Sequence, residues 1–380
     1  MSEHLTTSVR TEDTGFWGLV DRVTANRWVR WVVLIAFLAL LLLLPLVAEP
    51  FTNQTITRIA VFAVAVLGLN IIMGYTGQVS LGHIFFVGVG AYCAIIPIRA
   101  WWGGDLAEGS IVIGFVLALV IPGVLGLVIA LAAVRLRGLA LAMVTIALPI
   151  IGVPLAKRFS DITGGNEGVS IKRLDYLSSS GATLKGNPFS APPGIGLADD
   201  QWQYYIVVVI SVILFALAFF LVRGKFGRAF AIVKENEAVA ASMGISPYWY
   251  KVISFTISAV FGGAAGFLYI VALQYTSSEA LSFGHSIELV IATIVGGAGS
   301  IAGSFLGGVV YVLLPQLTNA VYPEATTAVQ GVVILLVLFL LPGGLASLPR
   351  VIRRRTSRRR GGPTAGADLA ADIAPGITKR

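Results

Sequence analysis

Charged residues and cysteine are both scarce in this sequence. Cys93 is the single cysteine among 380 residues, which excludes an intramolecular disulfide and a thiolate metal cluster within the chain. Only 12% of the residues are charged and 56% are hydrophobic. The mean hydropathy of +0.86 is well above the value typical of a soluble globular domain. These values predict an integral membrane protein.

Acidic residues are especially rare inside the hydrophobic segments. Glu288 is the only acidic residue that we place within a predicted span, whereas proton-driven pumps normally carry Asp or Glu there. A phosphate loop of the form G-x-x-x-x-G-K-[ST] is also missing, because Gly224-Lys225 lacks the upstream glycine and the hydroxyl residue. The sequence therefore shows no energy source of its own.

Long uncharged stretches recur along the chain. Residues 31–47, 111–134 and 204–222 are almost free of charge, and about 20 such residues cross roughly 30 Å of hydrocarbon as a helix. A β-barrel would instead show alternating segments of about ten residues. We therefore expect an all-α integral membrane protein with about ten transmembrane helices. The predicted spans are residues 28–48, 56–73, 84–99, 110–134, 138–157, 202–222, 250–272, 286–298, 301–319 and 328–348.

The distribution of Lys and Arg predicts the orientation of these spans, because cytoplasmic loops carry an excess of both. If the glycine-rich residues 296–299 join two separate crossings, the basic cluster at 350–360 returns to the cytoplasmic face and its anionic lipids. The basic residues that mark the cytoplasmic side are Arg22, Arg27, Arg30, Arg135, Arg137, Arg223, Lys225, Arg228 and Lys234. The predicted organisation is a cytoplasmic N-terminal segment (1–27), a transmembrane domain (28–348) and a basic, disordered cytoplasmic tail (349–380).

A short internal repeat divides the transmembrane domain. "SLGH" at residues 80–83 returns as "SFGH" at residues 282–285, and the two contain two of the three histidines. Each follows the second span of a five-span half and precedes a short or glycine-interrupted span. Because five is odd, the second half enters the membrane from the opposite side. We expect two inverted repeats, 28–157 and 202–348, with broken or re-entrant segments. Between them, an external loop, 158–201, contains turns and loops at 163–168 and 187–196 rather than another domain.

Broken helices at matching places in inverted halves point to a transport pathway. Glycine permits the breaks, and Ser80 and Ser282 are suited to capping the helices that follow. The alternative is that these serines and histidines only satisfy backbone groups between packed helices. A metal site built from His83, His285 and Glu288 has no recognisable ligand spacing. The candidate pathway residues are Gln78, Ser80, Gly82, His83, Ser282, Gly284 and His285.

A short capped helix is predicted within "GRAFAIVKENEAVAASMGISPYWYK" at residues 227–251. Asn236 can cap a helix at 237–243, Gly244 fits the position after its end, and Ser246 with Pro247 can begin the next helix. Such a helix is about 10 Å long, too short to cross a membrane and unstable without packing. The pattern fits either a docking site for a cytoplasmic partner or an incidental helix in a solvated basic loop.

Four stretches together resemble the LivM-type permease of branched-chain amino acid ABC transporters. They are "GLNIIMGYTGQVSLGHIFFVGVGAY" (68–92), "TGGNEG" (163–168), "GRAFAIVKENEAVAASMGI" (227–245) and "IVGGAGSIAGSFLGG" (294–308). The resemblance runs from about residue 61 to residue 344, with the motifs in order.

The resemblance implies a non-catalytic, multi-pass permease subunit of the bacterial cell inner membrane. Its implied partners are a second, LivH-like permease, two ABC ATPase subunits that bind ATP and Mg, and an extracytoplasmic substrate-binding protein. The chain itself would need no cofactor. Residues 235–244 are implied to be the counterpart of the importers' "EAA" coupling loop, although the third alanine is not in its usual register. The candidate coupling residues are Arg228, Glu235, Asn236, Glu237, Ala240, Ala241 and Gly244.

Three other functions compete with this interpretation. A urea or short-chain amide ABC permease has similar membrane subunits, and these motifs do not separate it from an amino acid permease. An ion-coupled carrier or channel fits the inverted repeat, but the lack of buried acidic pairs argues against ion coupling. An intramembrane enzyme would need a nucleophile with a matched base, and Cys93 has no candidate partner beyond His83.

Overall fold

The computed structural model describes residues 41–101, 107–136, 139–172, 174–177, 183–192, 194, 196–321, 325–340 and 343–348. Met1–Val47 with Leu348–Arg380 forms one unit and Ala48–Ser347 the other. Residues 41–47 of the first unit are helical. The predicted N-terminal segment 1–27, most of the predicted span 28–48 and the tail 349–380 lie outside the described residues.

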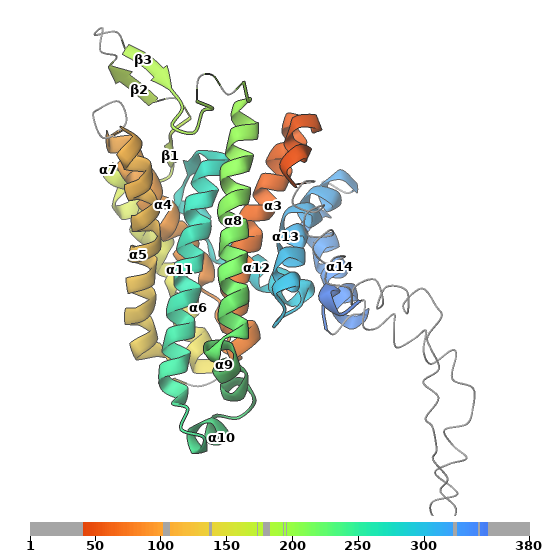
Figure 1. The fold of residues 1–380 in the computed structure, drawn as a ribbon. Coiled ribbons are helices and arrows are strands. Elements are labelled where there is room, and N and C mark those ends of the chain that lie inside the picture. Colours follow the sequence, from red (N-terminus) through yellow and green to blue (C-terminus); the bar gives the residue numbers. More distant parts are fainter. Residues whose placement is uncertain are drawn as a thin grey trace, which may run out of the picture. The chain divides into compact units, whose positions relative to one another are not determined.

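The unit Ala48–Ser347 is a bundle of long helices (Figure 1). Seven of the described helices are long and apolar enough to cross a membrane, and α12 is a shorter apolar helix. This confirms a helical membrane protein; ten crossings and an inverted repeat stay predictions. The seven long helices are α3 (Pro50–Asn70, continued by the π-helical η1, Ile71–Tyr75), α4 (His83–Trp101), α5 (Ala107–Ala133), α6 (Leu139–Arg158), α8 (Asp199–Arg223), α11 (Pro247–Leu273) and α13 (Ile301–Val321). The shorter ones are α7 (Ser160–Thr163), α9 (Lys225–Glu235), α10 (Glu237–Ser242), η2 (Ser278–Leu281), α12 (Phe283–Gly296), α14 (Thr326–Leu340) and η4 (Leu345–Ser347).

Helix boundaries follow local sequence signals. α3 begins at Pro50 rather than at the predicted residue 56, because proline is accepted in the first turn, where its missing N–H has no partner to lose. α12 and α13 are separate helices, as predicted, and the turn between them contains Gly297 and Gly299 with φ of 123° and 82°. Residues with a Cβ rarely adopt such angles.

Four short strands lie in the connections at the end of the bundle opposite α10 (Figure 1). β1 (Val169–Ser170) pairs antiparallel with β4 (Tyr275–Thr276), and β2 (Leu174–Leu177) pairs with β3 (Thr183–Gly186). The turns and loops predicted at residues 163–168 and 187–196 are present, and the four strands, which were not predicted, lie outside both stretches. Strands this short have too few positions to show an alternating pattern, and β1 finds its partner far along the chain.

Close packing of small residues brings α4, α5 and α11 together. A methyl group on Gly90 of α4 would lie 2.5 Å from the carbonyl oxygen of Gly263 in α11, so the two backbones touch directly. Small residues commonly produce such contacts between membrane helices. α3 and α11 are mostly buried, whereas α5 and α8 expose apolar residues such as Val120 and Phe220. The exposed faces of α5 and α8 are suited to lipid.

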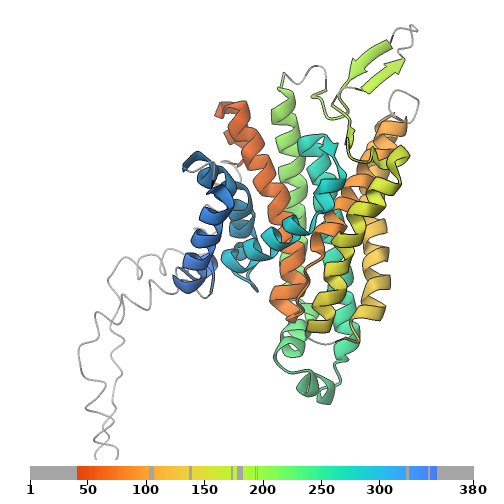
Figure 2. The same cartoon turned by 180° about the vertical axis from the view of Figure 1, so that it is seen from behind.

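α12 lies in the middle of the bundle, between the end that carries β2 and β3 and the end that carries α10 (Figures 1 and 2). A helix that starts inside the bundle leaves its first backbone N–H groups among other helices rather than in water. The surroundings of that start form the candidate site.

Candidate functional site

The chain interrupts its helix at "YTGQVSLGH", residues 75–83. α3 passes into the π-helical turn Ile71–Tyr75, Gly77 has a φ of 71°, and α4 starts only at His83. π-helical turns are frequent at functional sites. Irregular backbone inside a membrane protein is tolerated where it is buried in protein or lines a cavity. The predicted break in the helix is confirmed.

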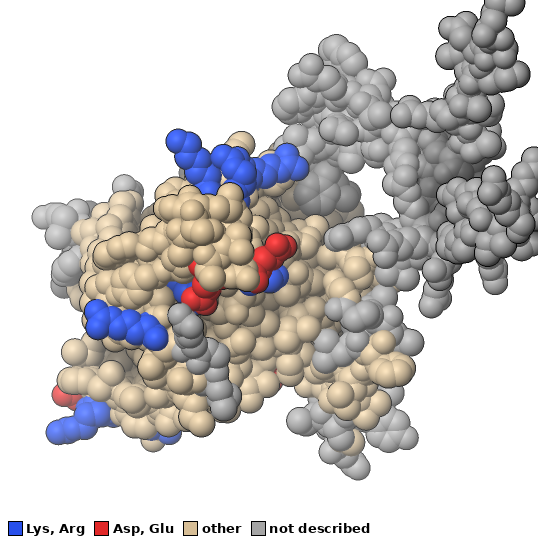
Figure 3. Space-filling view, turned by 90° about the horizontal axis from the view of Figure 1, so that it is seen from below, with Lys and Arg blue, Asp and Glu red and all other residues tan. Residues whose placement is uncertain are grey.

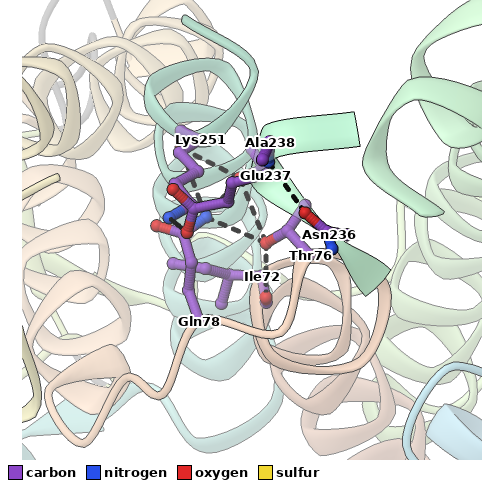
Figure 4. A network of polar contacts seen from close by, with 8 residues as sticks. Ile72, Thr76, Gln78, Asn236, Glu237, Ala238 and Lys251 are labelled. Atoms are coloured by element: carbon purple, nitrogen blue, oxygen red, sulfur yellow. Dashed lines mark hydrogen bonds and ion pairs between the residues drawn. The ribbon is translucent and has the colours of Figure 1, made fainter. Parts of the chain in front are cut away.

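Polar side chains link this break to α11 (Figure 4). Gln78 Nε2 donates to Ser254 Oγ of α11 at 2.9 Å and to Thr76 Oγ1 at 2.9 Å. The Thr76 hydroxyl donates to the carbonyl of Ile72 at 2.6 Å, inside the π-helical turn. Gln78 is only 4% exposed, so in this conformation it contacts α11 rather than an open passage.

The amino-terminal ends of α4 and α12 are neighbours. The Ser286 hydroxyl of α12 donates to the carbonyl of Leu81, and Leu281 lies so close to Gly88 of α4 that a methyl group there would overlap it. Helix amino termini carry partial positive charge and free N–H groups. Two such ends together favour a negatively charged or carbonyl group. The starts of α4 and α12, which follow the two repeat stretches, therefore lie together; that the repeat stretches line a pathway stays a prediction.

The two repeat histidines have different environments. His83 is 1% exposed, its Nδ1 lies 3.2 Å from Ser258 Oγ of α11, and its ring fills the space beside Gly68 and Gly262. His285 has a side chain that is 46% exposed. His83 thus contributes to the packing of α3, α4 and α11, whereas His285 remains available to a ligand.

The other predicted pathway residues divide in the same way. Ser80 and Gly82 are buried, and a methyl group on Gly82 would lie 3.0 Å from the carbonyl carbon of Thr145 in α6. Gly284 is exposed, and among the described residues beyond its chain neighbours the atom nearest to a methyl group there is Ser282 Oγ, at 3.9 Å. The first-repeat residues are thus enclosed by protein, whereas Gly284 and His285 of the second repeat are exposed and Ser282 is half-buried.

The prediction that the repeat serines cap the following helices was wrong. Ser282 occupies the N-cap position of α12, but its hydroxyl makes no capping hydrogen bond. Ser80 lies too early in the chain to cap α4, which begins at His83. The irregular residues between the break and α4 set the position of the helix start, and the serine spacing alone could not reveal them.

A pocket of about 340 Å³ lies beside the exposed face of α12. His285 and Glu288 of α12 line it, with His285 Nδ1 3.0 Å from Glu288 Oε2. Tyr311 of α13 places its hydroxyl 3.4 Å from the same nitrogen. Arg58 of α3 adds a guanidinium group, and apolar side chains of α4 complete the lining. The pocket therefore combines opposite charges with an apolar wall.

The predicted short helix forms at the opposite end of the bundle from the strands. Asn236 Oδ1 accepts from the backbone N–H groups of Ala238 and Val239 at 2.9 and 3.2 Å, and α10 follows directly. Gly244 has a φ of 77°. These features confirm the predicted cap and the left-handed glycine. The helix ends at Ser242 rather than residue 243, and Pro247 begins α11 without a side-chain cap from Ser246.

Two lysines connect this segment to the helix break. Lys234 Nζ of α9 donates to the carbonyl of Gly74, in the π-helical turn, at 2.7 Å. Lys251 Nζ of α11 lies 2.5 Å from Glu237 Oε1 of α10, and the carbonyl of Lys251 lies 3.5 Å from Gln78 Nε2 (Figure 4). Polar contacts thus run from α10 through α11 to the break.

The remaining predicted coupling residues form the surface of this end. Arg228, Glu235, Ala241 and Gly244 are exposed, while Ala240 is buried against the bundle. Figure 3, a view onto this end, shows more Lys and Arg than Asp and Glu side chains. An exposed surface on a helix that also contacts the bundle is suited to a partner that moves it.

Sequence reasoning missed several residues of the site. It used Lys234 only as a marker of the cytoplasmic side and assigned no role to Lys251. It also did not single out Asn70, whose side chain donates to Ser304 Oγ at 2.7 Å and accepts from the N–H of Gly299 at 2.7 Å. Asn70 could have been found, because an amide inside an apolar span usually has a specific partner. Nothing in the sequence selected Arg58 as a site residue, because arginine near the end of a membrane helix is common.

The end of the bundle with the strands has its own connections. Tyr275 donates its hydroxyl to the carbonyl of Glu167 at 2.9 Å, and Gly168 has a φ of 75°. A methyl group on Gly168 would lie 2.9 Å from Ser277 Cβ. The "TGGNEG" motif therefore forms a tight turn that contacts the connection between α11 and α12.

Three features define a multi-pass membrane transport protein. The helices are apolar, interrupted helices have ends that meet within the bundle, and the short helix α10 at one end of the bundle is linked to the interruption. Residues 51–338 match the family model described as the branched-chain amino acid transport system permease component. The chain belongs to this family.

Curated relatives carry the same description. The chain is 28% identical over 327 residues to the high-affinity branched-chain amino acid transport permease protein LivM of Escherichia coli, covering 81% of this chain and 74% of LivM. It is 24% identical to LivH of Escherichia coli (78% of this chain, 94% of LivH) and 24% identical to BraD of Pseudomonas aeruginosa (76% and 92%). No solved structure matches the chain significantly.

Proposed function

We propose that this chain is one of two permease subunits of an ATP-driven importer that carries branched-chain amino acids across the bacterial cell inner membrane. The family and the names of the relatives support the substrate class. The single structural observation that supports an external motor is the contact chain from α10 to the helix break. Neither a channel nor an ion-coupled carrier needs such a segment.

The partners follow from this function. A LivH-like permease would complete the membrane assembly, two ABC ATPases would supply free energy by hydrolysing ATP, and an extracytoplasmic binding protein would deliver the substrate. The basic end with α10 would face the cytoplasm, in line with the positive-inside rule. The end with β2 and β3 would then meet the binding protein.

In this mechanism, movement of α10 reaches the membrane helices by two routes. The Glu237–Lys251 ion pair transmits it to α11, and the hydrogen bond from Lys234 to Gly74 transmits it to the end of α3. Both routes converge on the irregular residues that hold the start of α4. A shift of that start relative to α12 would open the passage to one side and close it to the other, and no bond of the substrate changes.

Reconstitution tests this proposal. The full complex, with both permeases, both ATPases and the binding protein, is placed in proteoliposomes and supplied with labelled leucine, isoleucine, valine, urea or acetamide. We expect ATP-dependent accumulation of the three amino acids only. Uptake of urea or acetamide instead would identify the amide permease alternative, and uptake without ATP would identify a carrier or channel.

A further inference from the structure

Glu288 carries a carboxylate that would be unfavourable in contact with lipid. It lies on α12, a helix inside the bundle, and its side chain is 49% exposed. An acidic side chain that faces hydrocarbon within a membrane helix is strongly unfavourable. The exposed face of α12 must therefore border water, a ligand or another protein surface rather than lipid.

The pocket beside this face places a cation and an anion on different elements. Arg58 comes from α3 and Glu288 from α12, and both line the same space of about 340 Å³. Within the described residues, no ion pair joins Arg58 to Glu288. Glu288 is instead oriented by His285, whose Nδ1 lies 3.0 Å from the carboxylate. The pocket thus holds opposite charges that do not neutralise each other by direct contact.

The rest of the lining is largely apolar. Ile84 and Val87 come from the first turns of α4, and Phe62 and Leu273 come from α3 and α11. The volume is at the low end of the range of about 300–1,000 Å³ typical of ligand pockets. The space therefore suits a small molecule with one aliphatic side.

We propose that this pocket binds an aliphatic α-amino acid as a zwitterion during its passage through the permease. The Arg58 guanidinium pairs with the α-carboxylate, for which its planar fork of N–H donors is suited. The Glu288 carboxylate accepts hydrogen bonds from the α-ammonium group, and the apolar wall contacts the side chain. Urea and neutral amides carry neither charge, so the pocket selects against them.

This inference rests on the proposed function and adds a site to it, so its test separates the two. The complex of both permeases and both ATPases, purified without the binding protein, is assayed for binding of labelled leucine in competition with leucinamide and 4-methylpentanoate. Leucinamide lacks the carboxylate, and 4-methylpentanoate lacks the ammonium group. Wild-type protein should bind leucine about tenfold or more tightly than either analogue, as expected for loss of one charge-assisted hydrogen bond.

Each charge is then removed separately. Arg58→Gln should abolish the preference for leucine over leucinamide and keep the preference over 4-methylpentanoate; Glu288→Gln should do the reverse. Lys172→Gln and Glu279→Gln are the matched controls, because both residues are exposed and Lys172 lines a neighbouring pocket with Arg58. If Arg58 or Glu288 had only a structural role, its replacement would weaken the binding of all three ligands equally.

Unchanged preferences in both variants would overturn the inference, and so would a lack of competable leucine binding to the wild-type complex. If the reconstituted wild-type transporter takes up leucine with ATP in either case, only the pocket assignment fails. If it takes up no branched-chain amino acid, the proposed function fails.

Discussion

Glu237→Gln should leave the transporter assembled and yet lower the amount of amino acid moved per ATP hydrolysed. The substitution removes the carboxylate that lies 2.5 Å from Lys251 Nζ. A hydrogen bond to a charged group contributes about 1.5–3 kcal/mol. The Lys251 side chain is 13% exposed and that of Glu237 is 38% exposed, so partial solvent screening reduces this to about 1–2 kcal/mol.

This free energy sets the expected size of the effect. Because about 1.4 kcal/mol corresponds to a factor of ten, the equilibrium between the two states of the permease would shift roughly five- to thirtyfold if α10 biases α11 chiefly through this pair. The assay measures uptake and phosphate release together in proteoliposomes. We expect the ratio of uptake to hydrolysis to fall at least about fivefold, while the yield of assembled complex stays close to that of wild type.

Two further variants make this test specific. Lys251→Met should reproduce the loss, and the double variant should be no worse than either single one, because partners in one interaction have non-additive effects. Lys225→Gln, which removes an exposed charge at the start of α9, is the control and should transport normally. An unchanged ratio for Glu237→Gln, or additive losses in the double variant, would refute this transmission route.

Three further predictions concern other parts of the site. Gly244→Arg should abolish co-purification of the ATPases while the chain still inserts into the membrane, and Gly244→Asn, which tolerates the left-handed backbone, should be milder; normal co-purification of the arginine variant would contradict this. Gly82→Ala should lower protein abundance severalfold, because the methyl group would overlap a backbone carbonyl, whereas Gly284→Ala has space; equal abundance in immunoblots would count against it. His83→Ala should lower the thermal stability of the purified chain, whereas His285→Ala should slow uptake with little loss of stability; the opposite pattern would exchange their assigned roles.

Features encoded by a few adjacent residues could be predicted well. Asn236 and Gly244 bracket α10 because the capping amide and the left-handed glycine act within one helical turn. The break after Tyr75 followed from the same local reasoning about glycine and polar residues. The separation of α12 from α13 followed from the parity of the spans and the glycines between them.

Features that depend on distant contacts could not be predicted. The histidine repeat suggested equal roles for His83 and His285, but burial depends on which helices pack against each ring. The ring of His83 packs against α3 and α11, whereas the side chain of His285 is 46% exposed. The bond from Lys234 to Gly74 joins residues far apart in the chain, and no spacing rule links them. The role that we assign to Arg58 likewise depends on its sharing a pocket with Glu288, which lies on another helix.

The most direct test of the central claim is thiol accessibility at the junction of α4 and α12. Ala280 lines the pocket beside α12, so Ala280→Cys in a Cys93→Ser background is treated in the full complex with a water-soluble maleimide, with and without leucine, before and after trapping with ATP and vanadate. Val120→Cys, on the exposed apolar face of α5, is the lipid-facing control. A transport pathway at this junction predicts that the thiol of the Ala280→Cys variant reacts, that leucine slows the reaction and that trapping changes its rate severalfold, while the thiol of the Val120→Cys control stays unreactive. Reaction of the pocket thiol that is as slow as that of the lipid-facing control, and unaffected by leucine or trapping, would contradict the account.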